Sequence, residues 1–268
     1  MAAQDSLTAE FLAFAHRLGD AAGSVIMPSY RTGITANDKS DGGRFDPVTA
    51  ADRAAEEAIR GLIARTYPSH GVIGEEFGSE NTEAEFVWVL DPIDGTKSFI
   101  SAIPLWGTLI GLLHEGKPLL GLSDHPFLRE RFWGDGQTAT GSDRSRSWPL
   151  ASRKPLPLRD AVVFAGSSVT DDPGLFERLG TLKQRVRMIR FGSDCYDTCM
   201  LAEGHIDAIL QTGLDIYDVA ATVPIVTGAG GVVSGLDGGP ALRSGTILTS
   251  GDPALHVELL SLLAPDNQ

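Results

Sequence analysis

The sequence is poor in features that mark several whole classes of protein. It has two cysteines, Cys195 and Cys199, among 268 residues, which excludes a disulfide-stapled scaffold. Because they stand four residues apart they form no Cys-x-x-Cys redox motif, and we interpret them as small buried apolar residues. The longest nearly apolar run, residues 103–113, is too short to cross a bilayer, so we expect no membrane partner.

Positive charge is also scarce. Lys and Arg number 22 against 35 Asp and Glu, which gives a net charge of −13. Nucleic-acid binding depends on counterion release by basic side chains, so we expect no nucleic-acid partner. An acidic chain binds a phosphate group only where metal ions or helix N-termini supply positive potential. The first residues show no basic-then-apolar pattern of a secretory signal, and we expect a cytoplasmic protein.

What the sequence contains is typical of a mixed globular protein of one or two domains, with 42% hydrophobic and 21% charged residues. Apolar spacing predicts two helices, over residues 7–27 and 50–66, and we interpret two polar stretches, 32–46 and 134–147, as loops. Residues 115–117 read as a hairpin turn. Apolar runs predict strands at 72–73, 86–90, 105–113, 118–123 and 129–133.

The second half alternates between strand and helix patterns after a linker-like stretch at residues 154–157. We predict strands at 162–164, 187–191 and 206–210, and helices at 175–182, 195–202 and 219–227. Such alternation indicates an α/β or α+β protein. We expect two parts, an N-terminal α+β half over 1–150 and a C-terminal α/β half over 151–268.

Acidic residues follow two of the predicted strands. Asp91 and Asp94 stand three apart across a proline, so both carboxylates can turn toward one point. Glu75 and Glu76 follow another strand, and adjacent carboxylates directed into a cleft make sense mainly around cations. The alternatives are a plain turn for the aspartates, since Asp, Pro and Gly all favour turns, and exposed surface positions for the glutamates.

Two further aspartates belong to the same pattern. Asp218 lies at a predicted helix start, where Asp215 could equally be an N-cap and Asp218 a favourable first-turn charge. Asp46 precedes the helix at residue 50 and would alone pass for a turn residue. Glu75, Asp91, Asp94 and Asp218 together form an all-oxygen ligand set, which suits Mg²⁺ or Mn²⁺ rather than Zn²⁺. The sequence has no P-loop, no Gly-x-Gly-x-x-Gly and no Gly-x-Ser-x-Gly.

These segments resemble the motifs of the inositol monophosphatase superfamily over about residues 10–262. Within it, the stretch 94–100 and the residues around Asp194 and Tyr217 are most similar to the histidinol-phosphatases of this type. The resemblance implies a layered αβαβα sandwich, usually a homodimer, acting on phosphate monoesters. The motifs that carry it are Asp46-Pro47-Val48-Thr49-x-x-Asp52, Gly74-Glu75-Glu76, Asp91-Pro92-Ile93-Asp94-Gly95-Thr96 and Tyr217-Asp218-Val219-Ala220-Ala221.

The resemblance also implies roles for these residues. Two or three Mg²⁺ ions are expected, with Mn²⁺ as a substitute and Li⁺ as an inhibitor. Glu75 and Thr96 would orient the attacking water, with Asp46 supporting Thr96, while the amides of Gly95 and Thr96 would hold the phosphate. The implied metal ligands are Glu75, Asp91 and the Ile93 carbonyl for one ion, Asp91, Asp94 and Asp218 for the second, and Glu76 for a weaker third.

Substrate choice depends on two departures from the inositol phosphatases. Gln211 replaces the glutamate that binds ring hydroxyls, and Asp194 replaces a small residue. Asp194 could pair with the ammonium or imidazole of histidinol phosphate, or it could N-cap the helix that begins near residue 195. We therefore expect a histidinol-phosphate phosphatase of histidine biosynthesis. The alternatives are an inositol-1-phosphate or broad sugar phosphatase, a nucleotide 3′-phosphatase and a non-enzymatic scaffold.

Overall fold

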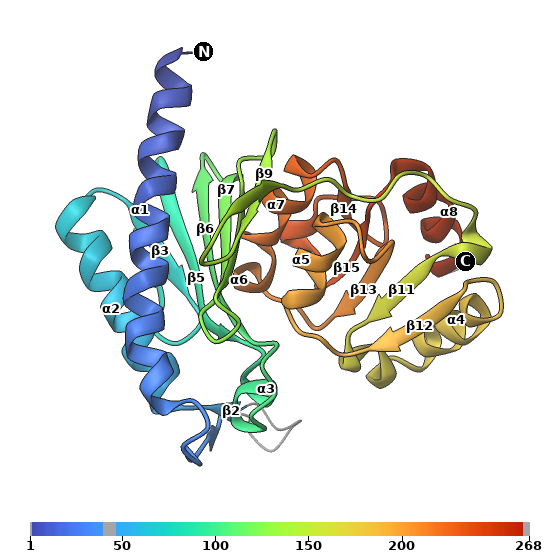
Figure 1. The fold of residues 1–268 in the computed structure, drawn as a ribbon, viewed down its shortest axis with the longest axis horizontal. Coiled ribbons are helices and arrows are strands. Elements are labelled where there is room, and N and C mark those ends of the chain that lie inside the picture. The colour runs from blue at the N-terminus through green and yellow to red at the C-terminus, as the bar shows by residue number, and fades with distance from the viewer. Residues whose placement is uncertain (1, 40–46, 265–268) are drawn as a thin grey trace.

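The computed structural model describes residues 2–39 and 47–264 and has five layers (Figure 1). Helices α1 (Ala2–Ile26) and α2 (Ala50–Thr66) cover one face of an eight-stranded sheet. A middle layer follows, formed by α5 (Tyr196–Ala202), α6 (Ile216–Val219) and α7 (Thr222–Gly228). A five-stranded sheet and the helices α4 (Pro173–Lys183) and α8 (Pro253–Leu263) complete the molecule. The expected αβαβα sandwich is confirmed.

The large sheet has the strand order β10-β9-β8-β7-β6-β5-β3-β4, and only β3 and β5 run parallel. The turn between β6 and β7 contains Glu115 and Gly116 at φ of 50° and 74°, the left-handed conformation that two-residue hairpins require, so the predicted hairpin is confirmed. Its strands are β3 (Gly71–Gly74), β4 (Gly78–Glu80), β5 (Phe86–Asp94), β6 (Gly107–His114), β7 (Lys117–His125), β8 (Glu130–Gly134), β9 (Ala139–Ser142) and β10 (Ser147–Pro149).

The second sheet has the order β12-β11-β13-β15-β14. β11 runs parallel to both neighbours, whereas β15 pairs antiparallel with β13 and β14. The strands are β11 (Val162–Ala165), β12 (Met188–Phe191), β13 (Ala208–Thr212), β14 (Val232–Gly235) and β15 (Thr246–Ser250). A separate pair, β1 (Asn37–Asp38) and β2 (Pro47–Val48), lies beside the short helix α3 (Thr96–Ile100).

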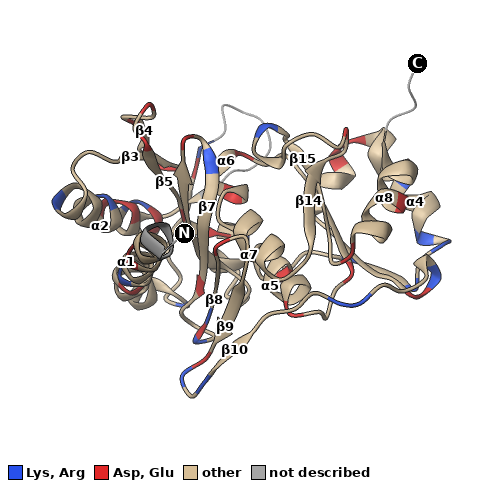
Figure 2. Cartoon of the chain, turned by 90° about the horizontal axis from the view of Figure 1, so that it is seen from above, with Lys and Arg blue, Asp and Glu red and all other residues tan. Residues whose placement is uncertain are grey.

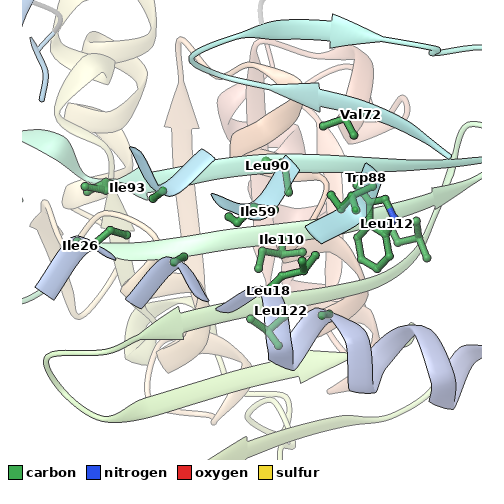
Figure 3. Close-up of a cluster of buried hydrophobic side chains, with 14 of the residues drawn as sticks. Leu18, Ile26, Ile59, Val72, Trp88, Leu90, Ile93, Ile110, Leu112 and Leu122 are labelled. Carbon is green, nitrogen blue, oxygen red and sulfur yellow. The ribbon is translucent and has the colours of Figure 1, made fainter. Parts of the chain in front are cut away.

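Strand β5 is buried on both faces and is central to the packing. Trp88 and Leu90 join the core beneath α1 and α2, whereas Val87 and Val89 pack against Ala220 of the middle layer. Because each fully buried large apolar side chain contributes about 1.5–3 kcal/mol, this two-sided burial fixes the strand firmly. Figure 3 shows the first of these cores, with labelled side chains from α1, α2 and the facing strands: Leu18, Ile26, Ile59, Val72, Trp88, Leu90, Ile93, Ile110, Leu112 and Leu122.

The interpretation of two polar stretches as loops was wrong in part. Residues 134–147 are not a plain loop, because β9 pairs with β8 and β10 pairs with β9. The described part of the stretch 32–46, also interpreted as a loop, contains the two-residue strand β1. The helix predicted over 219–227 is confirmed as α7, which begins three residues later, and the segments that form β14, β15 and α8 were not predicted. Backbone hydrogen bonding to a neighbouring strand forms β9 and β10, although their Gly, Ser and Thr content gives no apolar signal.

Charge is unevenly placed on this acidic protein. Figure 2 shows Asp and Glu along α1 and α2 and between the two sheets, whereas Lys and Arg gather at the turn between β9 and β10 and beside α4. Among residues 2–39 and 47–264, no helix combines the length and apolar character needed to cross a bilayer.

Candidate active site

A bulge at the end of β5 places two carboxylates together. The pairing of β5 with β6 shifts register between Asp91 and Asp94, where Pro92 interrupts the ladder. A bulge is a usual position for proline in a sheet, and it redirects the side chains that follow. Asp91 is 2% exposed, and the amide of Cys195 donates to Oδ1 of Asp94 at 2.8 Å.

The Gly74-Glu75-Glu76 turn lies beside this bulge, because β3 runs parallel to β5 and the amide of Glu75 donates to the carbonyl of Leu90 at 3.2 Å. Fully buried Glu56 of α2 accepts from the amide of Glu76 at 2.7 Å. A Cβ on Gly74 would come within 2.0 Å of the Glu56 carboxylate. The glycine is therefore required for this approach, which holds the two glutamates in place.

Asp218 reaches the site from the other half of the chain through close backbone contacts. A Cβ on Gly121 of β7 would lie 1.8 Å from the carbonyl oxygen of Ala221, and one on Gly111 of β6 would lie 3.0 Å from Ala220. Small residues on both sides let the start of α7 pack directly on the sheet. Asp215 caps α6, and its amide donates to Asp218 at 2.7 Å, so the predicted cap is present and coexists with the predicted ligand position.

Asp91, Asp94 and Asp218 form a concentrated acidic cluster. Each offers one carboxylate oxygen, and these atoms lie within 4.8 Å of one another. Burial, reinforced by neighbouring carboxylates, raises the pKa of Asp91 well above its ordinary value, that of Asp94 to about 7 and that of Asp218 to about 8. The Oδ1 atom of Asp91 is buried without a hydrogen-bond partner. An all-carboxylate cluster with an unsatisfied buried oxygen fits a hard divalent cation.

Lys39 was not predicted, yet it lies against the same cluster. Its Nζ is 2.7 Å from Oε1 of Glu75 and 2.9 Å from Oε1 of Glu76. Burial alone would lower the pKa of Lys39, but the hydrogen bonds to both glutamates raise it. The residue lies in the stretch interpreted as a loop, and no local sequence signal marks it as part of a site.

The motif around residues 46–52 contributes Asp52. Its carboxylate accepts from the amide of Thr49 at 2.8 Å, and Thr49 caps α2 in return. Burial raises the pKa of Asp52 to about 6, and the charges of Glu76 and Glu75 add to this shift. Asp46, the residue predicted to support Thr96, lies outside the described residues. Asp52 was part of the quoted motif but was given no role.

The turn that follows the bulge contains Gly95 and Thr96, whose amides are predicted to bind phosphate. Gly95 has a φ of 82° and precedes α3, which begins at Thr96. The hydroxyl of Thr96 donates to the carbonyl of Ile93 at 3.1 Å. Thr96 and the predicted ligand Ile93 are therefore in direct contact.

Two predicted substrate residues lie farther along the second half. The side chain of Asp194 does not cap α5, whose N-cap is Cys195 without a side-chain cap, so that alternative was wrong. Asp194 instead accepts a hydrogen bond from the hydroxyl of Ser98. Gln211 lies near the end of β13, and the next residue, Thr212, lines the cleft. A Cβ on Gly166 would lie 3.6 Å from Cγ of Gln211.

A cleft of about 570 Å³ opens over the acidic cluster. Its lining includes Asp218 from the cluster, the neighbouring Glu75, Lys97 from α3, and three further aspartates. The remaining lining residues are Ser168, Asp171, Asp172, Thr212, Gly213, Asp215 and Tyr217.

Comparisons with known proteins agree with this geometry. The sequence profile of the Inositol monophosphatase family matches residues 7–266. The chain is 38% identical to the histidinol-phosphatase of Streptomyces coelicolor, over 94% of this chain and 96% of that protein. It is 38% identical to the chloroplastic bifunctional phosphatase IMPL2 of Arabidopsis thaliana, over 94% of this chain and 75% of that one.

Solved structures support the same relationship. An inositol monophosphatase from Zymomonas mobilis, described as having a flexible region at its active site, superposes with a TM-score of 0.83 at 33% identity. The match covers 95% of this chain and 97% of that one. The chain is therefore a phosphatase and belongs to the metal-dependent inositol monophosphatase family.

Proposed function

We propose that this protein is a Mg²⁺-dependent phosphomonoesterase whose substrate is L-histidinol phosphate, a step of histidine biosynthesis. The observation that carries the proposal is the cluster of buried Asp91 with half-buried Asp94 and Asp218, which adjoins an acidic cleft lined by Asp218 and Glu75. Glu75, Asp91 and the Ile93 carbonyl would hold one ion, and Asp91, Asp94 and Asp218 a second, with Glu76 near a weaker third. Bound Mg²⁺ supplies a Lewis acid that neutralises phosphate charge and lowers the pKa of water.

The side chains around the cluster would then order the reactants. Glu75 would accept a proton from the attacking water, and Thr96 would orient that water through its hydroxyl. The hydroxyl already has an acceptor in the Ile93 carbonyl, which fixes its direction. The amides of Gly95 and Thr96 would hold the phosphate oxygens, and Asp46 would support Thr96. Mn²⁺ is expected to substitute for Mg²⁺, and Li⁺ to inhibit.

The charge of the cleft supports a cationic alcohol as the leaving group. Asp171, Asp172 and Asp215 also line the cleft, and Lys97 is the one basic residue among the described lining. Such a lining favours the ammonium and imidazole of histidinol phosphate over a neutral polyol. The relatives named histidinol-phosphatase lend the same support. An inositol phosphate is the second candidate, because a relative that is 32% identical is named a probable inositol 1-monophosphatase.

The test is phosphate release from histidinol phosphate and from inositol 1-phosphate, each with Mg²⁺ and with EDTA. We expect a strong preference for histidinol phosphate and no activity in EDTA. Glu75→Gln should reduce kcat by at least about 100-fold, because general-base contributions are of that size. Glu83→Gln, a change at an exposed glutamate outside the cleft, is the matched control. Preference for inositol 1-phosphate would refute the substrate assignment and leave the metal mechanism standing.

We also propose that two copies of the chain form a dimer. Ile103, Met188 and Phe191 are 46%, 43% and 45% exposed, and burial against a second copy would remove this apolar surface from water. Met188 also lines a cavity of about 380 Å³ together with the buried carboxylate of Asp197. Sedimentation equilibrium of the wild type and of Met188→Ser/Phe191→Ser tests the assignment. A wild type that is monomeric at micromolar concentration contradicts it.

A further inference from the structure

Two hydrogen bonds tie the metal-binding turn of the first half to one loop of the second half. The amide of Cys195 donates to Oδ1 of Asp94 at 2.8 Å, across 101 residues of sequence. The hydroxyl of Ser98 donates to Oδ2 of Asp194, across 96 residues. Adjacent residues of one loop therefore hold a predicted metal ligand and the helix that follows it.

The loop adopts a costly conformation to make these contacts. Gly192, Ser193 and Asp194 have φ of 81°, 119° and 47°, and a non-glycine residue at positive φ is uncommon. Such conformations persist where the surrounding structure over-determines them, and they concentrate at functional sites. A Cβ on Gly95 would lie 2.8 Å from both Cβ and Cγ of Asp194. Asp194 therefore packs against Gly95 at a distance that leaves no room for a side chain at residue 95.

Neither a helix cap nor a direct contact with the substrate accounts for these contacts of Asp194. Its side chain does not cap α5. A direct contact with the substrate would need a carboxylate directed at the cleft, whereas Asp194 is bonded to Ser98 and is not among the residues that line the cleft. The hydrogen bond from Ser98 to a carboxylate is charge-assisted and hence stronger than one between neutral groups.

We propose that the Ser98–Asp194 hydrogen bond is a positioning device for the metal site. It holds the 193–195 loop so that the Cys195 amide fixes one oxygen of Asp94 and leaves the other for a cation. It also fixes α3, whose first turn carries Thr96 and the phosphate-binding amides. This inference rests on the proposed phosphatase function, and Asp194 is a positioning residue that acts through Ser98 and Asp94.

A double-mutant cycle on Ser98 and Asp194 tests the proposal. Ser98→Ala removes the donor, and Asp194→Gly removes the acceptor without adding strain at positive φ. Asp194→Asn keeps an oxygen that accepts from Ser98 and tolerates the same φ, but it lacks the charge. Ser101→Ala, at the exposed C-cap of α3, is the matched control. A variant that fails to fold is replaced by Ser98→Cys, which keeps a weak donor.

Three readouts separate positioning from substrate contact. The first is kcat and KM for histidinol phosphate. The second is the same constants for p-nitrophenyl phosphate, whose leaving group carries no cation. The third is the Mg²⁺ concentration that produces half of the Tm increase caused by Mg²⁺. We expect Ser98→Ala and Asp194→Gly each to weaken Mg²⁺ binding and to lower kcat for both substrates by about 10–100-fold, the usual effect of removing a group that orients a metal ligand. The double variant should be no worse than either single variant, and Asp194→Asn should recover most of the loss.

Other outcomes overturn the proposal. If Asp194→Gly and Asp194→Asn both raise KM for histidinol phosphate alone while Ser98→Ala matches the wild type, Asp194 binds the substrate cation directly. Additive losses in the double variant show that the two residues act independently. If the wild type hydrolyses neither compound, the proposed function fails, and the Mg²⁺-dependent Tm cycle still decides whether the pair organises the metal site.

Discussion

Replacing the proposed metal ligand Asp94 should stabilise this protein when no metal is present. Asp94 is half-buried beside other carboxylates, and desolvation together with their charges raises its pKa from 3.8 to about 7 on folding. At pH 8 the folded protein must therefore hold an ionised group that its surroundings disfavour. Asp94→Asn removes this charge and keeps an oxygen that accepts from the Cys195 amide. The variant should be the more stable protein in EDTA, and the wild type should be the one stabilised by Mg²⁺.

The size of the effect follows from linkage. One pKa unit corresponds to about 1.36 kcal/mol, so the shift of Asp94 amounts to an upper value of about 4 kcal/mol at pH 8. Because the pKa is raised in the folded state, this cost is fully present above pH 7. It disappears as the pH falls through 7 toward 4, where the carboxyl binds its proton. The advantage of Asp94→Asn over the wild type should shrink over that same range.

The assay is urea unfolding at pH 8 and pH 5, in EDTA and in Mg²⁺. In EDTA at pH 8 the variant should unfold at a higher urea concentration than the wild type, and Mg²⁺ should reverse the order because only the wild type binds it strongly. Glu83→Gln, at an exposed glutamate, should change neither midpoint. A variant that is less stable than the wild type in EDTA at pH 8 would refute the reasoning.

Three further predictions concern the scaffold. Gly121→Ala should destabilise the protein by about 3 kcal/mol, because its Cβ would lie 1.8 Å from the Ala221 carbonyl oxygen. A Cβ added at Gly180 of α4 would have no atom within 4 Å, so Gly180→Ala should stabilise the protein by about 0.5–1 kcal/mol. Equal urea midpoints for the two glycine variants would contradict both predictions. Burial lowers the pKa of His125 to about 4, so the unfolded chain takes up the proton first, and about 3 kcal/mol of stability is lost between pH 6.5 and pH 4. His125→Gln should remove that dependence, measured as the difference in unfolding free energy at pH 7 and pH 4.5.

Local patterns predicted elements with strong apolar periodicity and missed those without it. The helices at 7–27 and 50–66 and the hairpin around residues 115–117 are confirmed, because amphipathic spacing and turn residues specify them within a short window. Residues 139–142 and 147–149 carry no such pattern, and pairing at the end of the sheet makes them strands. Their structure depends on a neighbouring backbone rather than on their own side chains.

The same distinction applies to the site. The motifs named Glu75, Asp91, Asp94 and Asp218 as an oxygen-ligand set, since residue type alone decides what a metal ion prefers. Nothing in the local sequence placed Lys39 against Glu75 and Glu76, because that contact depends on how distant segments pack.

The sequence by itself determined the chemistry of this protein, its layered α/β class and its strongest elements, because motifs and periodicity act over a few residues. Only the tertiary structure decided that Asp218 meets Asp91 and Asp94, through the approach of Ala221 to Gly121. Only the tertiary structure gave Asp194 a partner in Ser98, 96 residues away. Contacts of this kind form when two sheets and their helices pack, and the whole chain specifies that packing.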